Sequence, residues 1–183
     1  MRSTAPVGGG RSPLSLAIMS AEHDKSHRGN ASQFFVAGEL CRRGYAAVVT
    51  MGNTPNTDVL CSNRAGTKFV HIQVKTFVPG SMTCSVGRKA ERDFGPSFFW
   101  ILVGIPLASS IGSFEYFIIP ASDIARHVRE LHARWLSGVG KNGRVRRDSA
   151  VRAVGVGSKC YAHIWNVASY RDRWDFITKQ LDG

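Results

Sequence analysis

The sequence predicts an α/β protein in which helices flank a central mixed β-sheet. Strand-length apolar runs alternate along the chain with helical stretches, and 43% of the residues are hydrophobic while 20% are charged, a balance typical of packed globular proteins. With 183 residues the chain has the length of one domain. Its apolar runs are shorter than the roughly 20 residues that cross a bilayer, so no membrane association is expected.

The first 28 residues differ in composition from the rest of the chain. They are rich in Gly, Ser, Pro and charge, and their apolar run, Leu14–Met19, is shorter than the hydrophobic region of a secretory signal. We therefore expect a disordered leader over residues 1–28 and a single domain over residues 29–183. The four cysteines are scattered without a CxxC pair, which favours free thiols in a cytoplasmic protein.

A first helix is expected from Ala31 to Arg43. Asn30 is a suitable N-cap with Gln33 three residues on, and Gly44 follows the helix as a residue that tolerates positive φ. The middle of this helix is almost entirely apolar, which predicts burial. Glu39 is the one carboxylate within that apolar stretch.

Three strands are expected after this helix, over Tyr45–Thr50, Thr57–Cys61 and Lys68–Phe77. The third strand alternates apolar and polar residues with a period of two, which places each set on its own face. The apolar residues are Val70, Ile72 and Val74, and the polar ones are His71, Gln73 and Lys75.

The second half of the chain predicts further strands and two helices. Strands are expected over Met82–Val86, Phe98–Ile105, Phe114–Ile119 and Tyr161–Val167, and helices over Ser122–Leu136 and Tyr170–Gln180. The last helix carries an apolar stripe that predicts docking onto the core, formed by Tyr170, Trp174, Ile177 and Leu181. A basic, glycine-rich segment at about residues 137–160 separates the two helices and is expected to be irregular.

The first half of the chain also carries the residue types that phosphodiester hydrolysis requires. Asp58 supplies an anionic oxygen for a hard divalent cation, and the Gln73 amide and the Val74 carbonyl add neutral oxygens. Lys75 is placed to orient a nucleophilic water or to neutralise charge at phosphorus, and Glu39 to hold a metal-bound water or a second ion.

Each of these residues also has a structural interpretation. Glu39 can pair with Arg42 or Arg43 at the end of its helix, and Asp58 can end the polar loop that precedes the second strand. Gln73 and Lys75 can lie on the solvated face of a half-exposed strand.

The run Asp58-Val59-Leu60, followed by Ile72-Gln73-Val74-Lys75-Thr76 and preceded by the Glu39 helix, resembles the PD-(D/E)XK nuclease superfamily. The resemblance covers about Asn30 to Ile119. It implies a restriction-endonuclease-like core, with Glu39, Asp58, Gln73 and Lys75 as catalytic residues, a site for Mg²⁺, and Mn²⁺ as a substitute ion.

Two positions depart from the pattern of that superfamily. Thr57 replaces the proline that precedes the aspartate, and Gln73 replaces the acidic residue of the signature. The Mrr-like restriction enzymes resemble this chain in using Gln-x-Lys. The neutral amide removes one negative charge from the metal site, and weaker metal binding is therefore expected.

Charge points to the same substrate class. The 24 Lys and Arg outnumber the 13 Asp and Glu, which leaves a net charge of +11, and nine of the basic residues lie between Arg126 and Lys159 against two acidic ones. Such a local excess favours a polyanion, most commonly nucleic acid, although a solvated basic loop has the same composition. The predicted nucleic-acid contacts are Arg134, Lys141, Arg144, Arg146, Arg147 and Arg152.

The sequence therefore predicts a metal-dependent endonuclease acting on DNA, of the restriction, repair or junction-resolving type, with a homodimer as one way to cut both strands. Two alternatives stay open. The chain can be a catalytically inactive nuclease-like protein that binds nucleic acid, or a basic protein that binds RNA or a protein partner.

Overall fold

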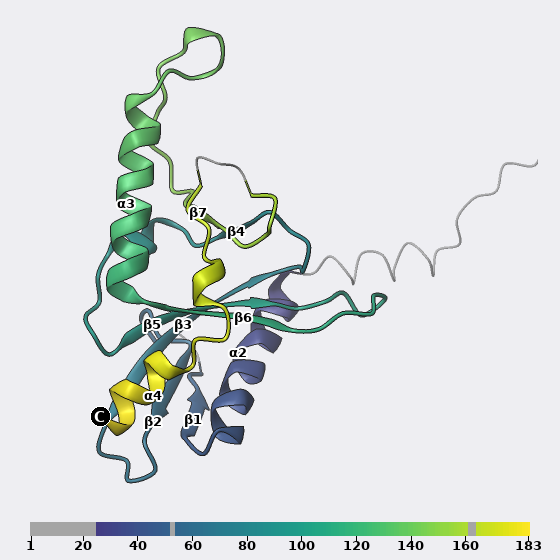
Figure 1. The fold of residues 1–183 in the computed structure, drawn as a ribbon, viewed down its shortest axis with the longest axis vertical. Helices are drawn as coiled ribbons and strands as arrows, with labels where there is room; N and C mark the ends of the chain where they lie inside the picture. Colours follow the sequence, from purple (N-terminus) through teal and green to yellow (C-terminus); the bar gives the residue numbers. More distant parts are fainter. Residues whose placement is uncertain (1–24, 52–53, 161–163) are drawn as a thin grey trace, which may run out of the picture.

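A computed structural model describes residues 25–183 except 52–53 and 161–163 (Figure 1). Five strands form the central sheet in the order β1-β2-β3-β5-β6. They are β1 (Ala46–Val49), β2 (Val59–Ser62), β3 (Phe69–Phe77), β5 (Phe98–Gly104) and β6 (Glu115–Pro120). Only the β3–β5 pair of this sheet is parallel, so the sheet is mixed, as predicted.

Helices and a small second sheet cover the two faces of the central sheet (Figure 1). One face carries α2 (Lys25–Arg42) and α4 (Asp175–Asp182). The other carries α3 (Ala121–Ser137) and the pair of β4 (Thr83–Ser85) with β7 (Ala153–Gly155). The short 3-10 turns are η1 (Arg88–Glu91), η2 (Lys141–Gly143) and η3 (Ala168–Tyr170).

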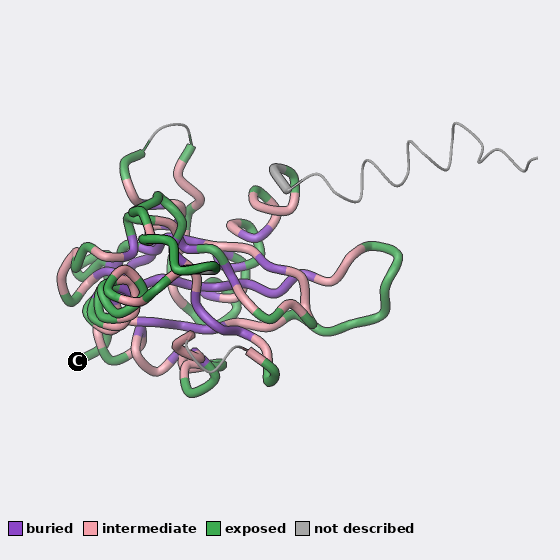
Figure 2. The backbone as a smooth tube through the Cα atoms, turned by 90° about the horizontal axis from the view of Figure 1, so that it is seen from above, coloured by how far each residue is buried: buried purple, intermediate pink, exposed green. Residues whose placement is uncertain are grey.

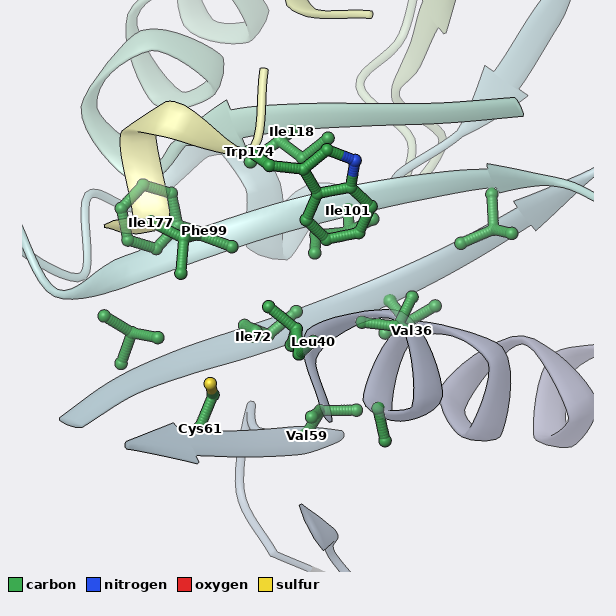
Figure 3. Packing of buried hydrophobic residues seen from close by; sticks show 14 of the residues in the cluster. Val36, Leu40, Val59, Cys61, Ile72, Phe99, Ile101, Ile118, Trp174 and Ile177 are labelled. Carbon is green, nitrogen blue, oxygen red and sulfur yellow. The ribbon is translucent and has the colours of Figure 1, made fainter. Parts of the chain in front are cut away.

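The first core cluster joins α2 and α4 to the sheet. Val36 and Leu40 of α2 pack towards Val59 and Ile72, while Trp174, the residue before α4, covers the β5–β6 side of the same face (Figure 3). The apolar set predicted on β3 is buried here, which confirms the period-two pattern. Each large apolar side chain buried in this way stabilises the fold by about 1.5–3 kcal/mol.

The second core cluster lies on the opposite face of the sheet and joins it to α3 and to the small sheet. The buried segments run through the middle of the molecule, with exposed chain on the outside (Figure 2). Gly104 ends β5 where a Cβ atom would lie 2.8 Å from Cζ of Phe77, so this position favours glycine.

Two helix boundaries differ from those predicted. Helix α2 starts at Lys25, so Asn30 lies inside the helix and does not cap it, whereas Gly44 follows its end with a φ of 94° as expected. Helix α4 starts at Asp175 and not at Tyr170, because Asp172 has a φ of 53° and interrupts helical geometry.

The predicted strand over Tyr161–Val167 and the predicted leader are described only in part. Residues 161–163 and 1–24 lie outside the described residues, and residues 25–28 belong to α2. Over 164–167 the structure has a single bridge, between Gly155 and Asn166, and no continuous strand.

The basic segment is more ordered than predicted. Residues 138–147, named here the basic hairpin, follow α3 and project from its end (Figure 1). Val139 pairs with Val145, and Asn142 and Gly143 take positive φ values at the turn. In the part of the chain that the structure describes, no helix is long and apolar enough to span a membrane.

Candidate active site

Asp58 occupies the point at which β2 begins. Val59 pairs with Ile72 of β3, so Asp58 lies next to Gln73 across the two strands. The Asp58 amide donates to the Ile72 carbonyl at 2.8 Å, and the Thr50 amide donates to the Asp58 carbonyl at 3.0 Å. These main-chain bonds hold Asp58 at the edge of β3.

The Asp58 carboxylate takes the hydrogen-bonding place that β2 leaves free at the edge of β3 beyond Ile72. Its Oδ2 atom accepts a hydrogen bond from the Val74 amide at 2.7 Å and contacts Nε2 of Gln73. Because the N–H and C=O of one strand residue point to the same edge, the Val74 carbonyl faces the Asp58 side as well. The structure therefore brings together Asp58, Gln73 and Val74, three of the four residues predicted to hold a metal ion, and leaves out the fourth, Glu39.

Gln73 and Lys75 share one face of β3 but differ in burial. Gln73 is only 8% exposed, so its interpretation as a solvent-facing strand residue is wrong. Lys75 is half-buried near Cys84 of β4, where burial raises the pKa of the Cys84 thiol to about 12 and the Lys75 charge opposes that rise. Among the described residues, Lys75 forms no hydrogen bond or ion pair, which leaves its ammonium group available.

Glu39 forms no hydrogen bond or ion pair with these residues in the described part of the chain. Its carboxylate pairs with Arg42 at 2.7 Å and with Arg43 at 2.9 Å, and these partners, Arg42 first, lower the pKa of Glu39. Its charge also acts on Tyr116 of β6, which β3 and β5 separate from β2 in the sheet. The pairing with arginine that the sequence left open is present, and a catalytic role for Glu39 stays a prediction.

The donor atoms at Asp58 fit a hard divalent cation. A carboxylate, an amide oxygen and a main-chain carbonyl are all oxygen ligands of the kind that Mg²⁺ and Mn²⁺ accept. Gln73 presents its amide nitrogen to the carboxylate, and a half-turn of the amide exchanges that nitrogen for its oxygen. Within the described ranges, no group of three His, Cys, Asp or Glu side chains could hold a metal, so this candidate site is poor in carboxylates.

Most of the predicted nucleic-acid contacts lie on or beside the basic hairpin. Arg134, Arg144 and Arg147 are exposed. Arg146 is half-buried, because its guanidinium lies 5.1 Å from the Trp135 ring and donates to the Trp135 carbonyl at 2.7 Å. The side chain of Lys141 lies outside the described part of the structure.

Arg152 is not part of this exposed surface, which corrects the prediction that it contacts nucleic acid. It is 5% exposed, and its guanidinium pairs with Glu91 and with Asp148. Asp148 also pairs with Arg88 and lies 2.8 Å from Nε2 of His132. A buried charge requires such partners, and Glu91 and Asp148 neutralise the Arg152 guanidinium beside the small sheet. Arg152 is therefore a structural residue of that sheet.

One polar contact beside the site did not emerge from sequence reasoning. The buried Thr57 hydroxyl, in the loop before β2, lies 3.1 Å from Nδ1 of His71 on β3. The polar alternation of β3 does place His71 on the face of Gln73. The strand register pairs His71 with Leu60, so the contact with Thr57 depends on the conformation of the loop before β2, which the sequence does not reveal.

Comparisons with known proteins agree with this arrangement at the level of the fold. No protein-family model and no curated protein matches the chain. A solved structure of a bacterial homing endonuclease, I-Ssp6803I, superimposes with a TM-score of 0.50 at 12% identity, over 84% of this chain and 91% of that chain. The chain therefore has the fold of a known endonuclease, with a mixed sheet flanked by helices.

Proposed function

We propose that this protein is a metal-dependent endonuclease of the PD-(D/E)XK type that hydrolyses phosphodiester bonds in DNA. One observation carries the proposal: the Asp58 carboxylate and the Gln73 amide meet against the Val74 main chain, at the edge of β3 where β2 no longer pairs with it. That edge belongs to a fold shared with a homing endonuclease. The signature with its Gln-x-Lys variant covers the same residues: Asp58 on one strand, and Gln73, Val74 and Lys75 on the next.

Asp58, Gln73 and the Val74 carbonyl would hold the divalent ion. When bound, such an ion neutralises phosphate charge and lowers the pKa of a coordinated water. Lys75 lies on the same face as Gln73 and would orient the attacking water or neutralise charge at phosphorus. Glu39 would join the site only by exchanging its ion pairs with Arg42 and Arg43, so we place it outside the minimal set.

The DNA would be bound by the exposed arginines of the basic hairpin and by Arg134. The net charge of +11 supports a polyanionic partner, and a hairpin that projects from the body can follow a phosphate backbone. Cleavage of both strands would require two active sites or two binding events, which a homodimer supplies. Restriction, repair and junction resolution all fit this core, because function is grafted onto a fold.

A second candidate is a catalytically inactive protein that binds nucleic acid. The observation in its favour is the single carboxylate, Asp58, among the three residues brought together. Fewer anionic ligands bind a divalent ion more weakly.

Relaxation of supercoiled plasmid DNA separates the two candidates. Wild-type protein is compared with Asp58→Asn in Mg²⁺, in Mn²⁺ and in EDTA. The endonuclease proposal predicts nicking by the wild type with either metal, and no nicking in EDTA or by the variant. DNA binding by both proteins, with no cleavage under any condition, would establish the inactive alternative.

A further inference from the structure

A cavity of about 330 Å³ opens beside the candidate active site. It lies between the polar loop that precedes β2 and an aromatic wall from the start of β5. The residues that matter to its chemistry are Asn56, Thr57, Leu60, His71, Phe94 and Phe98.

The floor of this cavity continues the strand face that carries the candidate metal ligands. Leu60 pairs with His71 across the antiparallel strands β2 and β3. Asp58, two residues before Leu60, and Gln73, two residues after His71, form the next pair on the same face. Two residues of a strand span about 7 Å. A phosphate bound to a divalent ion at Asp58 and Gln73 would therefore place its own nucleotide within reach of the cavity.

The walls offer both kinds of contact that a flat heteroaromatic ring makes. Phe94 and Phe98 stack on each other with centroids 4.5 Å apart and form an apolar wall. Asn56 and the ring of His71, which pairs with Phe98 across β3 and β5, add polar groups to the lining. Nδ1 of His71 lies 3.1 Å from the Thr57 hydroxyl, and its Nε2 forms no hydrogen bond or ion pair among the described residues. Pockets for an unstacked nucleobase combine apolar packing with hydrogen bonds to the polar edge of the base.

We propose that this cavity binds the base of the nucleotide adjacent to the phosphate that is cut. The proposal rests on the proposed function, because a divalent ion at Asp58 and Gln73 would set the position of the phosphate and hence of the nucleotide. A base can enter only after it leaves its stack, so DNA with an unpaired or mismatched nucleotide at this position should be the better substrate.

The test is an NMR titration of the full-length protein in Mg²⁺ with the four deoxynucleoside 5′-monophosphates and the four 3′-monophosphates. The control ligand is 2-deoxyribose 5-phosphate, which lacks a base. At least one nucleotide should bind tenfold or more tightly than the control, with shifted amides at Leu60, His71 and Phe98 and with contacts between base protons and the Leu60 methyl groups. Equal affinity for nucleotide and sugar phosphate, or no binding of either, would overturn the proposal.

Two variants assign the binding to the cavity. Leu60→Trp fills the floor and should weaken nucleotide binding at least tenfold, while Ile111→Trp adds a comparable bulk at an exposed loop and should leave it unchanged. His71→Leu, at an exposed strand position, should weaken binding several-fold and serves if Leu60→Trp fails to fold. Unchanged binding in a folded cavity variant would overturn the proposal. Plasmid relaxation by the wild type decides separately whether the protein is an endonuclease.

Discussion

Replacing Asp58 tests whether its carboxylate holds the edge of β3 in addition to any metal. Asp58→Ala removes the acceptor of the Val74 amide and the partner of the buried Gln73 amide. A buried donor left without an acceptor costs about 1–3 kcal/mol. We therefore expect Asp58→Ala to lower the free energy of unfolding by about 2 kcal/mol in the absence of metal.

Asp58→Asn separates this structural role from metal binding. The Asn amide oxygen can still accept from the Val74 amide, so we expect a loss of only about 0.5 kcal/mol. It removes the negative charge, however, so Asn should abolish the rise in melting temperature that Mg²⁺ produces in the wild type. The control is Glu130→Ala, an exposed change in α3 that should stay within about 0.5 kcal/mol of the wild type.

Urea denaturation in EDTA measures these differences directly, and thermal unfolding provides a second readout. A loss of about 2 kcal/mol corresponds to roughly 4–8 °C in melting temperature for a domain of this size. If Asp58→Ala and Asp58→Asn both unfold like the wild type in EDTA, the carboxylate does not satisfy the Val74 amide and the described edge is wrong.

Three further predictions address the surface, the acid limit and the core. Replacing Arg144 and Arg147 together by Ala should reduce the steepness of the plot of log K for DNA binding against log salt by up to about 2. The control Arg64→Ala, an exposed change in the β2–β3 turn, should leave that slope unchanged. An unchanged slope in the double variant would place the DNA elsewhere. The pKa of Asp175 is lowered to about 2, chiefly by its hydrogen bond from Arg173, so the stability it contributes is present above about pH 4 and is lost as the pH falls towards 2. Asp175→Asn should therefore reduce the dependence of the free energy of unfolding on pH in that window. An identical pH dependence in the variant and the wild type would contradict the pairing. Gly104→Ala should cost about 1–3 kcal/mol in urea unfolding, because its Cβ would meet the Phe77 ring, and a neutral result would mean that the ring moves freely.

The presence of a mixed sheet and the order of helices and strands along the chain could be predicted, because their sequence signals are local. The alternation on β3 reports its buried face directly, and Gly44 marks the end of α2. The same alternation could not show that Gln73 is buried, because the cover over that face comes from β4 and from residues far along the chain. The sequence predicts helix α4 to begin too early, because the left-handed backbone of Asp172 leaves no clear mark in the sequence.

The candidate site was predictable in part for the same reason. The strand register that joins Asp58 to Gln73 follows from one short connection between neighbouring strands. The ion pairs of Glu39 are local too, and the sequence left them open as an alternative. Arg152 is different, because its partner Glu91 lies 61 residues away in the sequence. Local charge composition therefore assigns Arg152 to the surface, although the fold buries it.

The central claim is that Asp58 and Gln73 hold one divalent ion, and calorimetric titration with Mn²⁺ tests it most directly. Gln73→Glu adds a negative charge at a ligand position and should tighten Mn²⁺ binding, whereas Gln73→Leu, of similar bulk, removes the oxygen and should weaken it. Affinity is the quantity to compare, because a more firmly held ion can also slow turnover. We expect the order Gln73→Glu, wild type, Gln73→Leu from the tightest to the weakest binding. Equal affinities for the three proteins would contradict a metal site at Gln73 and would favour the inactive, nucleic-acid-binding alternative.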